Sequence, residues 1–411
     1  KLFRCVTGLL RDKKAVSAYT TGFGGIAEAV MKMCFGNMIG FKYDDKADLK
    51  DIFKKQYLTM VLELNDNVSL KDIPEGAYSV ERLGETVLDE AVSFGSDDIK
   101  LEELLGVYEG KLESVFSCNI SQGDSPRYES ITYKAASVTA PNIRTARPEM
   151  VIPAFPGTNC EYDSAKAAAD AGADPHIFVV KNLTPEAVAE SVEEFAALVR
   201  SSQMIFIPGG FSGGDEPDGS GKFITAFFRN QAVKEAVTDL MDNRGGLMCG
   251  ICNGFQALIK LGLVPFGRII DTDETCPTLT FNTIGRHQSR IARVRIASDL
   301  SPWLSYTRPG EVYSVPISHG EGRFICDERL LKKLAENGQI ATQYVDLNGE
   351  PVSDVHFNPN NSVCAVEGIT SPDGRIFGKM GHAERIGSGL YKNVPGNYDI
   401  RMFEAAVRFF G

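Results

Sequence analysis

From residue 149 onward, short apolar segments alternate with longer segments that have helical periodicity. The apolar segments cover residues 150–155, 175–180, 204–207 and 246–249, and the helical ones cover 161–172, 185–200 and 221–243. Strands that alternate with helices indicate βαβ units and a largely parallel sheet. The predicted fold of this part is therefore α/β, a doubly wound and mostly parallel sheet of the flavodoxin-like type.

The rest of the chain has a different organisation. Residues 1–120 mix helical and strand patterns, including a glycine-rich helix start at 22–33, which predicts an α+β piece. Residues 121–148 are polar and interrupted by prolines, so we expect a linker there. The last predicted domain covers 149–411, and within it residues 276–320 have the pattern of a β-ribbon.

One cysteine lies between two glycines, directly after the last apolar segment. In Gly250-Ile251-Cys252-Asn253-Gly254-Phe255-Gln256, a strand-like segment is followed at once by a helix-like one. A strand–turn–helix elbow presents a nucleophile in a strained backbone conformation, and the flanking residues must be small. The N-terminus of the following helix also stabilises negative charge. We therefore predict that Cys252 is a nucleophile.

Other interpretations of this cysteine stay open. Most cysteines are small, buried, hydrophobic residues, which we expect of Cys249, and a plain core turn would give Cys252 the same role. The two also form a Cys-x-x-Cys pattern, which is typical of a redox pair or of half a zinc site. A redox pair is expected to have its first cysteine at the helix start, and a zinc site needs a second pair, so neither fits well.

A cysteine nucleophile needs a base, and the base needs an acceptor that orients it. Of the five histidines, His382 comes directly after a strand-like segment at 375–378. Residues two apart in an extended segment face the same side. His382 and Glu384 are therefore the predicted base and orienting carboxylate. The alternative is a surface histidine beside a solvated Glu-Arg pair.

Glycine-rich and polar loops supply the remaining candidates. Ligands bind at the carboxyl ends of parallel strands, and residues 208–215 follow one strand with glycines at 209, 210, 213 and 214. Backbone amides in such a loop can approach a substrate closely, so it is the predicted oxyanion hole, with a flexible loop as the alternative. Residues 282–290 and 318–323 are candidate substrate contacts, unless their histidines are solvated or structural.

Charge and cysteine usage restrict the partners. The 411 residues carry a formal net charge of −11, with a sequence pI of about 5.1. That balance argues against nucleic acid and against an anionic membrane surface. Nine cysteines without a framework spacing fit a reducing cytoplasm, and no apolar run reaches the length of a membrane helix. Because the first residue is Lys1 rather than Met, we expect further chain upstream.

Taken together, the motifs resemble a known family. Residues 250–256 combined with Gly381-His382-Ala383-Glu384-Arg385 resemble the triad (class I) glutamine amidotransferases. From about residue 149 to 411, the chain is similar in particular to the glutaminase domain of the phosphoribosylformylglycinamidine synthase family. The segments that carry this resemblance are Phe155-Pro156-Gly157-Thr158-Asn159-Cys160-Glu161, Pro208-Gly209-Gly210-Phe211-Ser212, His319-Gly320-Glu321-Gly322 and Phe357-Asn358-Pro359-Asn360. Residues 1–120 resemble the carboxyl-terminal end of the synthetase portion (AIR synthase-like) in the large single-chain form.

The resemblance implies a glutaminase in which Cys252 attacks the side-chain amide of glutamine, His382 transfers protons and Glu384 orients His382. The implied oxyanion and substrate-binding residues are Gly209, Gly210, Phe211, Asn253, Gln256, Ser318 and His319. No metal and no cofactor are expected for the glutaminase itself. The ammonia would serve a synthetase portion that converts formylglycinamide ribonucleotide with ATP and Mg²⁺, whose ligands we expect mostly upstream of Lys1.

Two other classes of function compete with this one. Cysteine hydrolases of the peptidase or stress-protein type share the elbow on a doubly wound sheet, but they usually carry histidine directly after the cysteine, where Asn253 stands. A non-catalytic interaction module of the same fold is the other class. The presence of Cys252, His382 and Glu384 together argues against it.

Overall fold

The protein, seen in a computed structural model, is described for residues 1–115, 117, 125–137, 140–211 and 221–411. The chain divides into two compact units, Lys1–Ser121 and Gln122–Gly411. Within the described residues, no helix has both the length and the apolar character needed to cross a bilayer.

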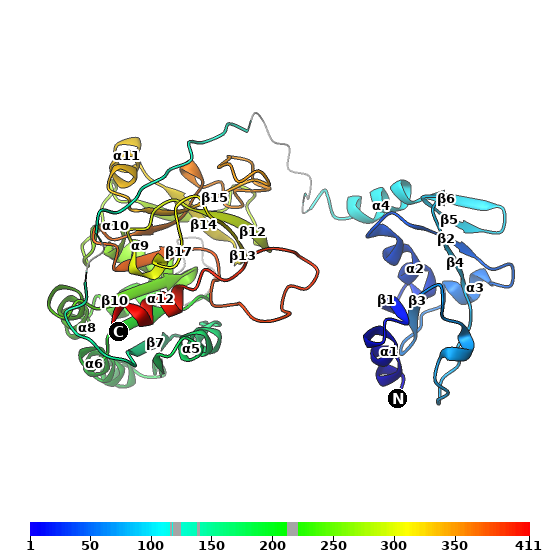
Figure 1. Ribbon diagram of the computed structural model, residues 1–411, viewed down its shortest axis with the longest axis horizontal. Coiled ribbons are helices and arrows are strands. Elements are labelled where there is room, and N and C mark those ends of the chain that lie inside the picture. The colour runs from blue at the N-terminus through cyan, green and yellow to red at the C-terminus, as the bar shows by residue number, and fades with distance from the viewer. Residues whose placement is uncertain (116, 118–124, 138–139, 212–220) are drawn as a thin grey trace. The chain divides into compact units, whose positions relative to one another are not determined.

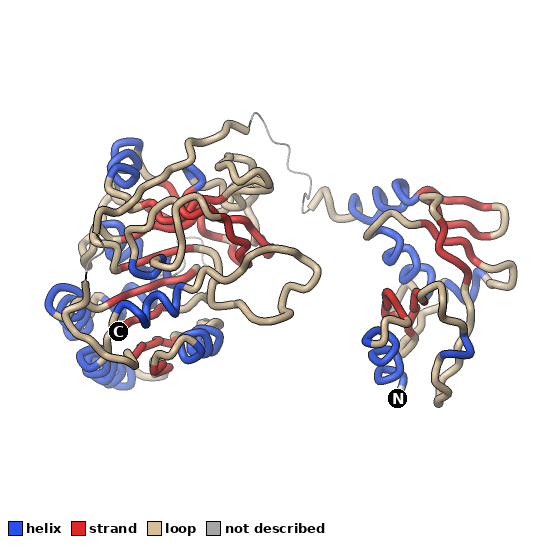
Figure 2. The backbone as a smooth tube through the Cα atoms, in the orientation of Figure 1, coloured by secondary structure: helices blue, strands red, loops and turns tan. Residues whose placement is uncertain are grey.

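The first unit combines two small sheets with short helices, as the mixed pattern predicts. One sheet is the antiparallel pair β1–β3, and the other has the strand order β4-β2-β5-β6 (Figure 2). The elements are α1 (Leu2–Arg11), β1 (Ala15–Thr20), α2 (Gly25–Phe35), β2 (Gly40–Tyr43), α3 (Leu49–Ile52), β3 (Met60–Leu64), η1 (Leu70–Asp72), β4 (Gly84–Val87), β5 (Ala91–Phe94), β6 (Asp97–Lys100) and α4 (Leu101–Gly110). A small core joins α2 to the four-stranded sheet through Val30, Cys34, Tyr43 and Leu101.

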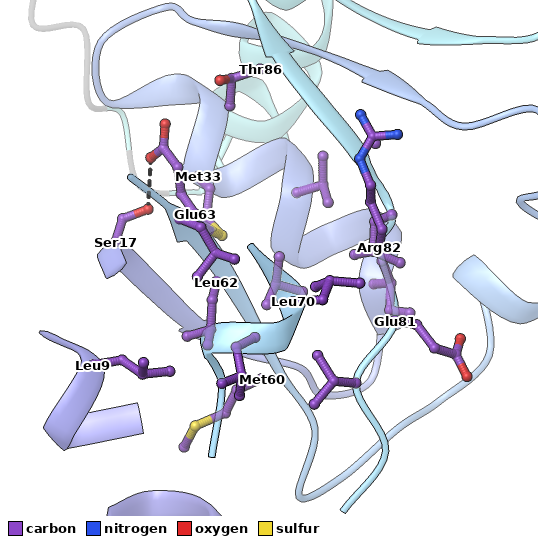
Figure 3. A pocket seen from close by; sticks show the side chains of 18 of the residues that line it. Leu9, Ser17, Met33, Met60, Leu62, Glu63, Leu70, Glu81, Arg82 and Thr86 are labelled. Atoms are coloured by element: carbon purple, nitrogen blue, oxygen red, sulfur yellow. Dashed lines mark hydrogen bonds between the residues drawn. The ribbon is translucent and has the colours of Figure 1, made fainter. Parts of the chain in front are cut away.

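This first unit also contains a cavity of about 1130 Å³ (Figure 3). Apolar side chains such as Leu9, Met33 and Met60 line it together with polar ones, and the Ser17 hydroxyl donates a hydrogen bond to Glu63 at 2.9 Å. None of the predicted site residues lies among its walls.

Residues 125–137 run along the second unit. The backbone amide of Tyr128 donates to the Pro351 carbonyl at 2.9 Å, and that of Tyr133 donates to the Ala297 carbonyl at 2.8 Å. The Ala135 amide donates to the Asp299 carboxylate at 2.7 Å. These bonds attach part of the predicted linker to the surface of the sheet domain.

A nine-stranded sheet organises the second unit, with the order β13-β12-β15-β16-β17-β10-β9-β7-β8 (Figure 1). The strands from β17 to β8 are parallel, and β16, β15, β12 and β13 extend the sheet in antiparallel fashion. The strand bounds are β7 (Glu149–Ala154), β8 (Asp174–Val179), β9 (Met204–Ile207), β10 (Leu247–Ile251), β11 (Thr278–Phe281), β12 (Gln288–Ile296), β13 (Val312–His319), β14 (Glu321–Ile325), β15 (Ile340–Tyr344), β16 (Val366–Thr370) and β17 (Ile376–Lys379). The predicted α/β fold with a mostly parallel sheet is confirmed for this unit.

The expected β-ribbon between 276 and 320 is divided between two sheets. Strand β11 pairs with β14 in a separate two-stranded sheet, whereas β12 pairs with β13 and β15 in the large one. The strands were predicted, but their partners were not.

Helices cover the sheet. Strands β9 and β10 are buried at each residue, so both of their faces are covered. Helices α6, α8, α7 and α9 form one connected layer, and α5 and α12 contact each other in another group. The bounds are α5 (Glu161–Asp170), α6 (Pro185–Ser201), α7 (Lys222–Phe228), α8 (Gln231–Thr238), η2 (Asp239–Asn243), α9 (Asn253–Leu261), α10 (Leu263–Phe266), η3 (Pro302–Leu304), α11 (Glu328–Glu336), η4 (Val363–Ala365) and α12 (Met402–Phe409).

The register of the parallel strands determines which loops meet. Ile251 at the end of β10 is opposite Lys379 at the end of β17, and Gly250 is opposite Ile207 at the end of β9. Because parallel strands end at the same edge, the loops after β9, β10 and β17 lie next to one another. These are the loops that contain Gly209, Cys252 and His382.

Candidate active site

Cys252 occupies the strained turn that the sequence predicts. Its backbone has φ 54° and ψ −107°, between the last residue of β10 and the first residue of α9. The side chain is 4 % exposed, and its amide donates to the Lys379 carbonyl at 2.9 Å. A left-handed conformation at a residue other than glycine costs on the order of 1–3 kcal/mol and is concentrated at functional sites.

The two flanking glycines are required by close packing. A Cβ at Gly254 would lie 2.1 Å from the Ile207 carbonyl oxygen, and one at Gly250 would lie 2.7 Å from the backbone of Gly254. The elbow therefore fits tightly against β9, which keeps the Cys252 thiol in a fixed position at the start of α9. Cys249, by contrast, is fully buried in the hydrophobic core, and burial raises the pKa of its thiol well above the usual range.

His382 and Glu384 form the predicted pair. His382 Nδ1 is 2.6 Å from Glu384 Oε1, and both side chains are buried. The His382 amide donates to the Pro316 carbonyl at 2.9 Å, which holds the backbone of this loop against β13. The spacing of two residues thus puts base and carboxylate on one side of the chain.

Electrostatics keep the proton on the imidazole. Burial is the largest single influence and would lower the pKa of His382, but the charge of the Glu384 carboxylate and the hydrogen bonds of the imidazole together outweigh it, so the pKa of His382 lies well above its ordinary value. Hydrogen bonds to the side chains of Cys160 and Cys252 act in the same direction. For Glu384, burial would raise the pKa, and the imidazole lowers it below the ordinary value.

Gly209 has no side chain, and this leaves room for the side chains of Cys252 and His382. A Cβ at this position would lie 2.6 Å from His382 Cε1 and 3.4 Å from Cys252 Cβ. Gly209 therefore packs directly against both the thiol residue and the imidazole. Any larger residue would compete with the base for room.

The structure supports only part of the predicted oxyanion hole. Gly210 has φ 147°, and a Cβ there would lie 2.5 Å from the Gly157 carbonyl oxygen, so glycine is required. The Phe211 amide already donates to that Gly157 oxygen at 2.8 Å. In this conformation Phe211 is thus not an oxyanion donor, which corrects that assignment. The rest of the predicted loop, 212–215, lies outside the described residues.

Asn253 and Gln256 lie in the first turn of α9, close to Cys252. The Asn253 side-chain amide donates to the Gln256 oxygen at 3.0 Å, and the Gln256 amide donates to the Glu321 carbonyl at 2.9 Å. The helix start directs its backbone N–H groups towards the thiol, as an anion site requires. Asn253 and Gln256 thus connect the elbow to the start of β14.

Ser318 and His319 reach the site from the end of β13. The Ser318 carbonyl is 3.9 Å from Cys252 Sγ, and the Ser318 hydroxyl is 3.0 Å from His287 Nε2. Burial lowers the pKa of His319 to about 3, so this imidazole is neutral. His319 Nδ1 is 3.0 Å from the Asn360 amide, and Nε2 has no hydrogen-bond partner among the described residues.

Sequence reasoning did not assign Cys160 and Arg385. Cys160 Sγ lies 3.8 Å from His382 Nδ1 and 3.2 Å from the Arg385 guanidinium. Arg385 also pairs with Asp163 at 3.1 Å. Cys160 directly follows Asn159 in the segment 155–161, which resembles the amidotransferases. Its place in that segment was the one sequence signal that could have marked it as a site residue.

A buried ion pair supports the loop that carries the base. Lys379 Nζ is 3.1 Å from Glu367 Oε1, and both side chains are at most 1 % exposed. The same carboxylate accepts a hydrogen bond from the Gly381 amide at 2.6 Å, and the Lys379 ammonium donates to the Gly381 carbonyl at 2.8 Å. Since the Lys379 carbonyl accepts from the Cys252 amide, one network fixes the elbow and the base loop together.

The donor atoms of one side-chain cluster beside the base do not match the ligands that Mg²⁺ prefers. This cluster, Cys160 with His382 and Glu384, is the one group of metal-ligating side chains among the described residues. Mg²⁺ prefers an octahedral set of oxygen ligands. A thiol and an imidazole do not fit that preference.

The doubly wound sheet thus carries a thiol, an imidazole and a carboxylate at the ends of adjacent strands, an arrangement that is typical of enzymes with a cysteine nucleophile. The sequence model of the CobB/CobQ-like glutamine amidotransferase domain matches residues 147–410. The chain belongs to this family, and the match lies within the second unit.

Named relatives are also similar to this chain over much of its length. The chain is 35 % identical over 257 residues to phosphoribosylformylglycinamidine synthase subunit PurQ of Methanococcus maripaludis, covering 62 % of this chain and 87 % of the relative. The subunit of the same name from Aquifex aeolicus is 31 % identical over 247 residues, covering 60 % and 92 %. Among solved structures, PurLQS from Thermotoga maritima aligns with a TM-score of 0.46 and 22 % identity, covering 64 % of this chain and all of that one.

Proposed function

We propose that this chain is the glutaminase part of phosphoribosylformylglycinamidine synthase. It hydrolyses glutamine and supplies the ammonia for the synthesis of formylglycinamidine ribonucleotide in purine biosynthesis. The observation that carries the proposal is the meeting of Cys252, His382 and Glu384 at the ends of two adjacent parallel strands, in a chain that matches PurQ subunits over most of their length.

The geometry suggests how the residues work. The Cys252 thiolate attacks the side-chain carbonyl carbon of glutamine, and the C–N bond of the resulting tetrahedral intermediate breaks. His382 gives its proton to the leaving nitrogen, so that ammonia departs and a glutamyl thioester remains. His382 then removes a proton from water, the hydroxide attacks the thioester, and glutamate leaves as the thiolate is restored.

Backbone donors stabilise the oxyanion in both steps. The amide of Gly210 and the N-terminal end of α9 lie on either side of the Cys252 elbow, and no hydrogen bond to the Gly210 amide occurs within the described part of the chain. Removing one such donor typically costs about 10²–10³ in kcat. Gln256, Ser318 and His319 would contact the glutamine itself.

The ammonia has a destination in this proposal. A synthetase portion uses it with formylglycinamide ribonucleotide and ATP, and Mg²⁺ serves that portion and not the glutaminase. Residues 1–120 form the end of that portion in a large single chain, joined by 121–148 to the amidotransferase domain at 149–411. We place the protein in the cytoplasm, because its cysteines are free within the described residues.

Ammonia release from glutamine tests the core of this proposal. Cys252→Ser is expected to abolish release while its thermal unfolding matches that of the parent. Cys276→Ser is the matched control, because Cys276 is partly exposed and its thiol donates to the Asp273 carboxylate at 3.6 Å. Full ammonia release by Cys252→Ser would contradict the assignment.

The finer part of the proposal needs the complete synthase. Product formation from formylglycinamide ribonucleotide is expected to require ATP and Mg²⁺ and to accept glutamine or free ammonia. The Cys252→Ser variant should lose only the glutamine-dependent reaction. Glutaminase activity that disappears with a Mg²⁺ chelator would contradict the expected absence of a metal requirement in this domain.

A further inference from the structure

Three metal-ligating side chains, one of them the proposed base, meet close to the proposed nucleophile. The ligating atoms of Cys160, His382 and Glu384 all lie within 4.8 Å of one another, and the three residues are 2–3 % exposed. They come from distant parts of the chain, because Cys160 is the N-cap of α5 and the other two follow β17. Neither the nucleophilic attack nor proton transfer needs Cys160.

The distances are close to those of a tetrahedral zinc site. With Zn–S near 2.3 Å and Zn–N and Zn–O near 2.1 Å, tetrahedral angles put pairs of ligand atoms about 3.4–3.6 Å apart. Cys160 Sγ is 3.8 Å from His382 Nδ1, which is already near this value. Glu384 Oε1, at 2.6 Å from the same nitrogen, would move by less than about 1 Å as the ion replaces the shared proton.

Two further features fit a cation. Glu384 Oε2 is buried and has no hydrogen-bond partner among the described residues, so the carboxylate has unused acceptor capacity in the cluster. The positive charge of Arg385, 3.2 Å from Cys160 Sγ, opposes a cation, but the guanidinium is already paired with Asp163. A thiolate and a carboxylate together would neutralise a divalent ion.

We propose that Cys160, His382 and Glu384 bind Zn²⁺ reversibly and that bound zinc switches the glutaminase off. The consequence for activity rests on the proposed function, whereas the binding does not. The donor set selects the ion, because thiolate and imidazole favour zinc over Mg²⁺ or Ca²⁺. Three protein ligands leave the fourth position to water.

Zinc bound to one nitrogen of the His382 imidazole is expected to inhibit the glutaminase, because it fixes the proton on the other nitrogen. Zinc on Nδ1 displaces the proton shared with Glu384, so a neutral ring must carry its proton on Nε2. That nitrogen then cannot accept the proton of Cys252 or of the attacking water. Zinc also engages Glu384, which no longer orients the base.

Cobalt is the probe that separates this site from the obvious rival, a metal bound by Cys252. Co²⁺ added to the intact protein should give a thiolate-to-cobalt absorption band and the visible bands of a tetrahedral ion, and Zn²⁺ should remove both. The bands are expected to persist in Cys252→Ser and in the control Cys276→Ser. They are expected to be lost in Cys160→Ser and in Cys160→Ala, with thermal unfolding showing that the variants are folded.

The activity measurement is the second arm. Zinc should inhibit ammonia release in the parent, and a chelator should restore it. The zinc concentration for half inhibition should rise by at least about tenfold in Cys160→Ser, when each protein is compared with its own zinc-free rate.

The cobalt spectra and the zinc inhibition together distinguish a failure of the metal site from a failure of the proposed function. Cobalt bands that vanish in Cys252→Ser and persist in Cys160→Ser would overturn the proposal, as would zinc inhibition that is equal in the parent and Cys160→Ser. If no variant or parent releases ammonia but the Cys160-dependent cobalt spectrum appears, the metal site stands and the proposed function fails.

Discussion

Position 209 has no room for a methyl group. Gly209→Ala would place a Cβ 2.6 Å from His382 Cε1, whereas nonbonded carbon atoms normally lie about 3.5–4.0 Å apart. The Gly209 carbonyl accepts hydrogen bonds from the Asn159 and Cys160 amides, which hold the backbone of this loop in place, so the imidazole must yield, by about 1 Å. That movement also stretches the 2.6 Å contact between His382 and Glu384.

A displacement of this size has a known cost. Misplacing a catalytic group by 1 Å can lower a rate by about 10²-fold, which corresponds to about 2.7 kcal/mol in the activation barrier. We therefore expect kcat for ammonia release to fall by about two orders of magnitude in Gly209→Ala. Because the clash involves a side-chain atom and not the backbone of a strand, the fold itself is expected to survive.

Steady-state ammonia release, with thermal unfolding of the same samples, measures both expectations. Gly36→Ala is the control: Gly36 has φ −58° and ψ −47°, and no neighbouring atom lies within 4 Å of its added Cβ. Its activity should equal that of the parent. A folded Gly209→Ala variant with unchanged kcat would refute the argument that this glycine makes room for the base.

Three other substitutions test the surrounding structure. Glu384→Gln should lower kcat by up to about 10⁴-fold. Because the pair raises the pKa of His382 and lowers the pKa of Glu384, the parent's thermal stability relative to this variant should be largest between pH 4.5 and 6.5, the ordinary pKa values of the two groups, and should decline as pH rises further. A stability difference that grows above pH 6.5 would contradict the ion pair. Lys379→Met leaves Glu367 charged and unpaired in the core and should reduce the free energy of unfolding by about 3–5 kcal/mol in a denaturant titration. Adding Glu367→Leu should recover much of that loss, and a single variant as stable as the parent would show that the pair is not buried as described. Gly254→Ala, whose Cβ would lie 2.1 Å from a backbone oxygen of β9, should cost about 1–3 kcal/mol, and an unchanged unfolding midpoint would contradict the tight elbow.

The parallel half of the sheet was predictable from the sequence for a physical reason. Its inner strands β7, β9 and β10 are buried on both faces, so they read as continuous apolar runs, and the intervening helices keep the helical period. The elbow and the His-x-Glu pair were predictable for a similar reason. Each is contained in a few consecutive residues, and strong local rules govern a strand–turn–helix nucleophile and an extended pair.

The antiparallel half was harder to predict. Strands β11 and β12 follow each other in sequence but pair with β14 in one sheet and with β13 and β15 in another. Local alternation identifies a strand without identifying its partner.

Features that depend on contacts between distant segments were missed. Cys160 is 222 residues from His382 in sequence, and its contact exists only because the turn after β7 lies beside the loop after β17. The Phe211 amide was assigned to the oxyanion, but the bridge between Thr158 and Gly210 directs it to Gly157 instead. Both outcomes depend on how the loops pack, which spacing alone does not encode.

The central claim is that Cys252 is the residue that attacks glutamine. Peptide mapping after labelling with azaserine, a glutamine-like electrophile, tests it most directly, with and without glutamine as a protecting ligand. We expect the label on Cys252, much slower labelling when glutamine is present, and none in Cys252→Ser. Label on Cys160 or Cys249 in place of Cys252, or labelling that glutamine does not slow, would contradict the account.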